Sequence, residues 1–166
     1  MRADRFESWL VDCLQAAGGP EVTTFAAAGY AARPLGVVLA LPSGASVYVQ
    51  IVRGSPPDGS DRRDPEPIVT GEPAAVLPPV ELPASGSVRT ADVEGWVAHA
   101  VSASGCAEIS AVERYSTSRD LGSETQRYGV HVACHSGADI YLLFAHTLRA
   151  GNSPNSGNAF QQLESV

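Results

Sequence analysis

Apolar residues recur at the spacing of an α-helix in two separate segments of the chain. The first stripe contains Phe6, Trp9, Leu10, Cys13, Leu14 and Ala17, and the second contains Val93, Trp96, Val97, Ala100 and Val101. Recurrence at intervals of three and four residues places each stripe on one face of a helix. Asp4 with Glu7 predicts a capping box at the first helix start, and Gly18 and Gly105 predict where the helices stop.

Each predicted helix is followed by three segments with the alternation of apolar and polar residues that strands show. We expect a first strand at about 21–29 in one half and at about 108–117 in the other. A hairpin follows in each half, formed by 36–42 with 46–53 and by 129–135 with 139–148. Ser-Gly-Ala, present in both hairpins, supplies the short glycine-containing loop that a hairpin needs.

The two halves of the chain also align with each other. Residues 36–52 match 129–145 at seven of 17 positions, and 6–22 match 93–109 at five of 17, both tryptophans included. The offset rises from 87 to 93 between these blocks, so the second half has gained six residues, which we place in the polar segment STSRDLGSETQ. We interpret the chain as one α-β-β-β unit used twice.

One such unit has too little apolar surface to bury its own sheet face, so we expect the two units to share a core. The prediction is an α+β domain in two layers, with about six mostly antiparallel strands and two helices packed on one face in pseudo-twofold symmetry. The element order resembles that of the secretion-chaperone fold, in which helices also back a sheet, and this resemblance concerns the fold alone. A single domain, 1–166, would then comprise repeat one (4–53), a Pro-rich linker (54–89), repeat two (90–149) and a disordered tail (150–166).

The linker holds eight of the 12 prolines. Because proline fixes φ and removes a backbone donor, we expect an extended segment without helix. The linker either passes directly from one repeat to the next or folds back over the exposed sheet face. Its VLPPVELP stretch is also a candidate ligand for SH3-like modules, although no basic residue flanks it.

Charge and composition disfavour several classes of function. The net charge is −7, and all 11 basic residues are arginines with no cluster larger than Arg62-Arg63, which disfavours nucleic-acid binding. No apolar run approaches the roughly 20 residues of a membrane helix, and the charged N-terminus is unlike a signal peptide. We therefore expect a cytoplasmic protein that binds no membrane. The abundance of Arg, Ala, Gly and Pro is typical of GC-rich genomes, such as those of actinobacteria and their phages.

Three histidines and a cysteine lie within HVACHSGADIYLLFAH, residues 131–146, and resemble a metal or nucleophile site. Alternation along the strand opposes both interpretations, because Cys134 joins the apolar, helix-facing residues while His131 and His135 point the other way. His131 and His135 are also about 13 Å apart, too far to share one zinc ion. We expect no catalytic residue, no metal and no other cofactor, with Cys134 as a core thiol. His135 is expected opposite Asp139 in a stabilising cross-strand pair.

The sheet face away from the helices is the predicted partner-binding site. Its residues are Tyr48, Gln50, His131, His135, Tyr141 and Leu143. This set is too apolar for ordinary surface and too polar for a sealed core, and tyrosine is enriched at interfaces. Three other interpretations stay open: the linker covers this face, the face is an ordinary half-wet sheet surface, or a small molecule binds there.

These observations favour a non-catalytic protein–protein interaction module. It would be an acidic accessory or chaperone-like subunit that presents its sheet to a client protein or to a second copy of itself. One alternative is a small enzyme or small-molecule binder that uses His131, His135, Asp139 and Tyr141. The other is a structural protein of a phage or mobile element.

Overall fold

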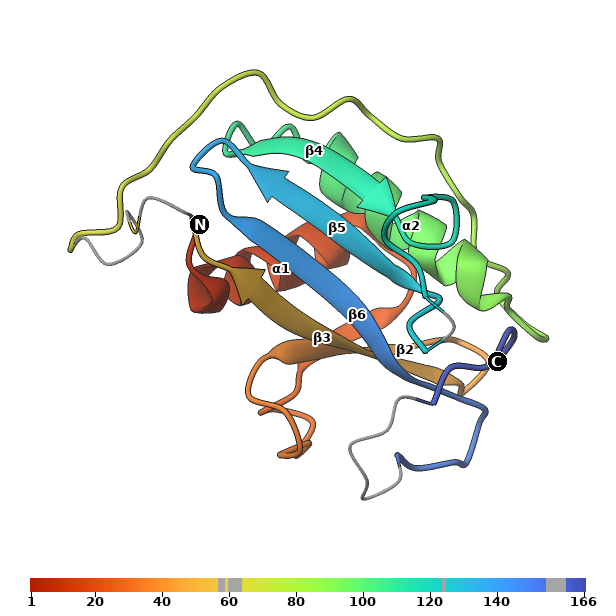
Figure 1. The fold of residues 1–166 in the computed structure, drawn as a ribbon. Helices are drawn as coiled ribbons and strands as arrows, with labels where there is room; N and C mark the ends of the chain where they lie inside the picture. Colours follow the sequence, from red (N-terminus) through yellow and green to blue (C-terminus); the bar gives the residue numbers. More distant parts are fainter. Residues whose placement is uncertain (57–58, 60–63, 124, 155–160) are drawn as a thin grey trace.

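The computed structural model describes residues 1–56, 59, 64–123, 125–154 and 161–166, which form two layers (Figure 1). One layer is a six-stranded antiparallel sheet with the order β1-β2-β3-β6-β5-β4, and the other consists of two helices on one face of it. This arrangement confirms the predicted two-layer α+β fold. The elements are α1 (Ala3–Ala17), β1 (Glu21–Thr24), β2 (Gly36–Ala40), β3 (Ser46–Gly54), α2 (Thr90–Ala103), β4 (Ile109–Arg114), β5 (Gly129–Cys134) and β6 (Asp139–Leu148).

The core lies between the sheet and the helices, and both halves of the chain contribute to it. The buried strand residues include Val37, Leu39, Val47, Val49 and Ile51 in the first half and Val130, Val132, Cys134, Ile140, Leu142 and Phe144 in the second. Phe6, Leu10 and Leu14 of α1 and Val93, Val97 and Val101 of α2 face them. Each large aliphatic or phenyl side chain buried here contributes about 1.5–3 kcal/mol. Cys134 is buried among them, as predicted.

Each helix is bonded to the middle strand of its own half through a glutamate. Oε1 of Glu7 accepts a hydrogen bond from the Gly36 N–H at 2.7 Å, and Oε1 of Glu94 accepts one from the Gly129 N–H at 3.0 Å. The alignment of the two halves pairs these glutamates and these glycines. The predicted capping box is therefore wrong, because the N-cap is Arg2, without a side-chain cap, and Glu7 bonds to the sheet instead.

Both glycines also lie against an aromatic ring. A Cβ at Gly36 would overlap the ring of Phe25, and one at Gly129 would lie 3.2 Å from the ring of Tyr115. The Phe25 N–H donates to the Gly36 carbonyl at 2.8 Å, and the Tyr115 N–H donates to the Gly129 carbonyl at 3.0 Å. Only glycine leaves room for these rings. The same contacts thus recur in both halves, while the duplication itself stays an inference from the sequence.

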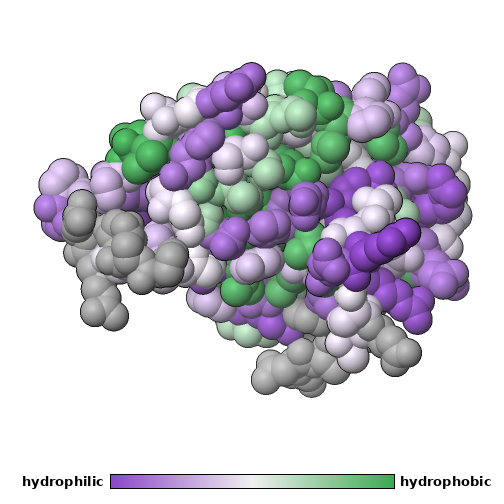
Figure 2. Space-filling model, turned by 45° about the horizontal axis from the view of Figure 1, so that its top comes forward, coloured by the Kyte–Doolittle hydropathy of each residue, from purple (hydrophilic) through white to green (hydrophobic). Residues whose placement is uncertain are grey.

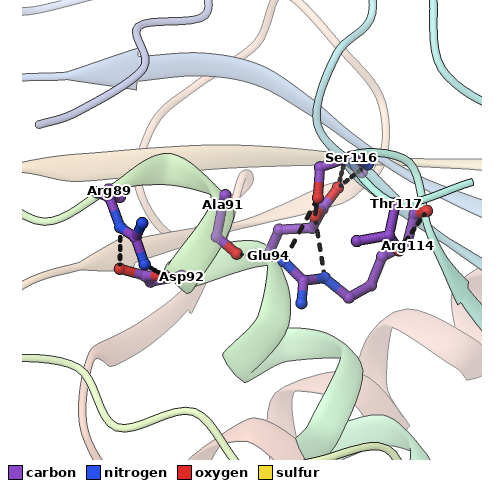
Figure 3. Close-up of polar contacts among 8 residues, drawn as sticks. Arg89, Ala91, Asp92, Glu94, Arg114, Ser116 and Thr117 are labelled. Atoms are coloured by element: carbon purple, nitrogen blue, oxygen red, sulfur yellow. Dashed lines mark hydrogen bonds and ion pairs between the residues drawn. The ribbon is translucent and has the colours of Figure 1, made fainter.

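Glu94 is the more buried of the two glutamates, with no exposed surface. Its carboxylate accepts hydrogen bonds from the N–H groups of Gly129 and Ser116, each at 3.0 Å, and from the Ser116 hydroxyl. Nε of Arg114 lies 3.1 Å from the same carboxylate and supplies the opposite charge (Figure 3). These hydrogen bonds and the Arg114 charge together offset the free-energy cost of removing the Glu94 carboxylate from water.

The first strand of each half is shorter than predicted. β1 ends at Thr24 and β4 at Arg114, where the chain turns. In both turns a main-chain bond spans four residues, from the Ala28 N–H to the Thr24 carbonyl and from the Ser118 N–H to the Arg114 carbonyl. The turn after β1 brings Tyr30 onto the sheet, so it determines what covers that face.

The described part of the Pro-rich linker packs on α2 and on the start of β4. The N–H groups of Gly71 and Ala74 donate to carbonyls at the start of β4, and the Leu77 N–H donates to the Ser102 hydroxyl at 3.0 Å. Figure 1 shows the linker running along this outer side of the molecule. Of the two roles left open, these contacts favour direct passage from one repeat to the next over a cover on the far sheet face.

Arg5 fastens the linker to the helical layer. Its guanidinium lies 2.9 Å from the Glu66 carboxylate in the linker and 2.7 Å from the Glu108 carboxylate before β4. The bond from Arg5 is the main cause that lowers the pKa of Glu66 to about 2. The ion pair therefore stabilises the linker's position above the ordinary carboxylate pKa and weakens as the pH falls toward 2.

Residues 161–166 differ from the disordered tail expected from the sequence. Val88 and Val166 exchange two backbone hydrogen bonds, at 2.7 and 2.9 Å, and the side chain of Val166 is buried in the core. The Gln161 N–H donates to the Ala145 carbonyl at 2.9 Å. Residues 161–166 are ordered because the Val166 side chain is buried while the backbone N–H groups of Gln161 and Val166 find carbonyl acceptors.

Glu94→Ala should destabilise the protein by about 3–5 kcal/mol, because the Arg114 charge and two N–H groups would lose their buried acceptor. Glu7→Ala is the matched control and should cost about 1 kcal/mol, since it removes a single bond at a partly exposed position. Urea unfolding followed by circular dichroism measures both losses. Equal losses would contradict the special role of the Glu94 carboxylate.

Candidate functional site

Five of the six predicted interaction residues share the sheet face away from the helices. They are Tyr48 and Gln50 of β3, His131 of β5, and Tyr141 and Leu143 of β6, and all are partly buried. The strand register places Gln50 opposite Leu143 and His131 opposite Tyr141. The structure therefore brings these five residues together across three adjacent strands.

His131 and Tyr141 form the centre of this face in the second half. Their rings are stacked, with centroids 5.0 Å apart and planes inclined by 19°. Nε2 of His131 lies 2.8 Å from Oδ1 of Asp139, which is half-exposed at the start of β6. The carboxylate therefore fixes the orientation of the imidazole against the tyrosine ring.

The predicted pairing of His135 with Asp139 is wrong. The hairpin closes at Cys134 and Ala138, whose backbone N–H and carbonyl bond at 2.9 Å, so His135 is the first residue of the loop. Its Nε2 lies 2.9 Å from the Glu72 carbonyl, and the side chain therefore contacts the linker. Where the strands end in the turn, the alternation that had placed His135 on the sheet face no longer applies.

The first half of the face is covered by the chain itself. Tyr30, from the loop after β1, packs edge-on against Tyr48 with centroids 5.0 Å apart, and its hydroxyl lies 2.8 Å from Nε2 of His146. Arg33, from the same loop, donates to the side-chain oxygen of Gln50 at 2.7 Å. Tyr48 and Gln50 are thus engaged in contacts within the protein.

The second half of the face has no comparable cover among the described residues. Tyr141 corresponds to Tyr48 in the alignment, and in the described chain the one ring stacked on it is His131 of the neighbouring strand. Tyr115, the counterpart of Phe25, is buried against Gly129. The two tyrosines are both partly buried, but their aromatic contacts differ, since the loop after β1 packs on Tyr48 and no described loop ring packs on Tyr141.

A β-bulge places His146 among the aromatic rings of the closed half. The register between β3 and β6 shifts at Tyr48 and Val49, so that His146 pairs with Tyr48 instead of continuing the core-facing series after Phe144. His146 is fully buried. Burial first, and then the positive charge of Arg33, lowers the pKa of the imidazole and favours its neutral form.

A groove of about 870 Å³ opens on the other side of the molecule, between the two helices and the linker. Trp9 and Cys13 of α1, Trp96 and His99 of α2, and Val80 and Glu81 of the linker are among its lining residues. From the sequence both tryptophans were assigned to core stripes, and the groove was missed. The signal that could have indicated it is the alignment of Trp9 with Trp96, which puts one indole on each helix.

Within the described ranges, no group of three or more His, Cys, Asp or Glu side chains is placed to hold a metal ion. Burial raises the pKa of Cys134, and it raises that of Cys13 to about 11, so neither thiol is a thiolate nucleophile at neutral pH. The pair of His131 with Asp139 is oriented as an acid–base pair, but no hydroxyl or thiol of the described chain bonds to His131.

Among the described residues, neither helix combines the length and apolar character needed to cross a membrane. No protein-family model, curated protein or solved structure matches the chain. The function therefore has to be inferred from the geometry and chemistry of the site.

The buried His146 predicts that stability falls with pH below neutrality. Its unfolded-state pKa is about 6.5, and its folded-state pKa is lower, so its contribution is complete above about pH 6.5 and declines below it. His146→Gln, which keeps an acceptor for Tyr30, should lose less stability than wild type between about pH 7 and pH 5. Thermal unfolding across this range measures the difference.

His99→Gln is the matched control, because it also removes one histidine but lies on the helical layer. Its stability should depend on pH as that of wild type does. If wild type and His146→Gln lose stability equally between neutral and acidic pH, the burial of a neutral imidazole does not limit stability in this range.

Proposed function

We propose that the protein is a non-catalytic binding module, an acidic accessory or chaperone-like subunit that docks a partner protein on the open half of its sheet face. The observation that supports this is the difference between two aligned tyrosines. Tyr48 is covered by Tyr30 of its own chain, whereas Tyr141 has no such cover among the described residues. A partner would supply the missing ring.

The contacts of the closed half indicate what the partner should present. There, an aromatic ring packs edge-on against Tyr48 while its hydroxyl bonds to an imidazole. The open half offers the ring of Tyr141, the side chain of Leu143 and an imidazole held by Asp139. We expect a protein loop with an aromatic residue seated on Tyr141 and a polar group close to His131. Aromatic pairs of this kind contribute about 0.5–1.5 kcal/mol beyond the area they bury.

The character of the surface favours a protein over a nucleic acid as partner. Figure 2 shows apolar and hydrophilic groups side by side on the surface in view. The large apolar side chains exposed in the described chain are Ile68, Val69, Val76 and Leu163. A net charge of −7 opposes contact with a phosphate backbone.

We place the protein in the cytoplasm, without a membrane partner. The three cysteines are free thiols, which is the ordinary state in a reducing compartment. A second copy of the chain is the other protein able to supply the ring, and the oligomeric state of the purified protein distinguishes it from a client.

Tyr141→Ala should weaken partner binding by at least about 30-fold, equivalent to roughly 2 kcal/mol for an anchoring residue. A photo-cross-linking amino acid at position 141, introduced in the native host, identifies the partner, whose Kd is then measured by calorimetry. Thermal stability should fall less than in Phe144→Ala, which opens a core cavity at a cost of about 3–5 kcal/mol.

Tyr48→Ala is the matched control, because it removes the same side chain at the aligned position that Tyr30 already covers. It should destabilise the fold and leave the Kd nearly unchanged. Equal weakening by the two variants, or no weakening by Tyr141→Ala, would contradict the proposed site. A dimer in gel filtration that Tyr141→Ala dissociates would identify the partner as a second copy.

A further inference from the structure

We infer that the groove between α1, α2 and the linker is a second binding site, for a peptide segment that carries arginine or lysine beside apolar residues. This site lies on the helical layer and does not depend on the function proposed for the sheet face. Its volume of about 870 Å³ is enough for several side chains.

The groove is apolar and admits close approach to the helix backbones. Cys13 of α1 and Ala100 of α2 form the floor of the groove, where the two helices touch. Sγ of Cys13 lies 3.4 Å from the Ala100 carbonyl. Small residues, among them Ala16, Ala17 and Ala103, line the ends of both helices. A bound segment can therefore reach the helices without displacing a large side chain.

Two indoles flank this floor. Trp9 packs against Phe6 with centroids 5.3 Å apart and is partly exposed, while Trp96 is largely buried and its ring lies against Gly19 at the edge of the groove. These are the two tryptophans of the chain, one from each helix. Indole rings attract guanidinium and ammonium groups through cation–π interactions, and tryptophan is the strongest partner for them.

The charges around the groove are complementary to a cation. Glu81 of the linker lines it and is exposed, and none of its described lining residues is an arginine. Both helices end there, α1 at Ala17 and α2 at Ala103, and neither has a basic residue in its last turn. A helix C-terminus carries partial negative charge that is usually balanced by Lys, Arg or His side chains. Here a partner's cation would balance it.

His99 and Val80 attach the linker wall of the groove to α2. Nδ1 of His99 lies 2.8 Å from the Leu77 carbonyl, and Val80 packs against Gly95 of α2. The linker wall is thus attached to α2 at two points, and the exposed Glu81 is part of this wall. A preformed wall reduces the ordering cost of binding.

Intrinsic fluorescence tests this site directly, because both tryptophans line it. The probe is an acetylated and amidated hexapeptide of alternating leucine and arginine, titrated into the full chain. It should shift the emission saturably and bind at least about tenfold tighter than the same peptide with glutamine in place of arginine. The peptide with glutamate should give no saturable change up to roughly 1 mM, and added salt should weaken binding of the arginine peptide.

Two substitutions separate the charge of the site from its shape. Glu81→Gln should weaken the arginine peptide about threefold to tenfold, whereas Glu72→Gln, at an exposed acid of the same linker outside the groove, should not. Ala103→Leu, or Ala16→Leu if the first variant does not fold, should fill the groove and abolish the emission change. Tyr141→Ala should leave the titration unchanged, because that residue lies on the other face of the sheet.

Equal binding of the arginine and glutamine peptides would overturn the assignment of a cation. The groove would be excluded as a binding site if both Glu81→Gln and the groove-filling variant bound the arginine peptide as tightly as wild type. It would also be excluded if no peptide gave a saturable change.

Discussion

The pairing of β3 with β6 joins the two halves of the chain into one sheet. Ser46–Gly54 pairs along its whole length with Asp139–Leu148, and no other strand pair in the described chain is as long. Since alternate residues of both strands face the helices, the same pairing brings Val49 and Phe144 into a common core. A helix with three strands would expose that apolar face, so α1, α2 and the groove between them all depend on this ladder.

One irregularity in the ladder accounts for much of the asymmetry of the sheet face. The bulge beside Tyr48 turns His146 away from the core and into contact with Tyr30 and Tyr48. The imidazole then gives the Tyr30 hydroxyl a buried partner, and the loop after β1 is held over the first half of the face. Among the described residues, the pairing of β2 with β3 and of β5 with β6 shows no such shift.

The two proposed sites lie on opposite layers, separated by the core. The sheet face offers partly buried aromatic and imidazole groups, while the groove combines two indoles with negative charge. Arg5 and Glu94 stabilise the frame of both, Arg5 by fastening the linker and Glu94 by bonding α2 to β5. Neither proposed site shares a side chain with the other, so the two proposals can be tested independently.

Local patterns along the chain determined the fold class, the approximate helices and hairpins, the burial of Cys134 and the common face of Tyr48 and Tyr141. They did so because periodicity records which way neighbouring side chains point. Only the tertiary structure decided that Tyr30 packs on Tyr48 and not on Tyr141, that Glu94 is a buried acceptor, and that His131 rather than His135 meets Asp139. These outcomes depend on a bulge, a turn length and the path of loops and linker, none of which has a repeating pattern, so they follow from contacts between residues far apart in the chain.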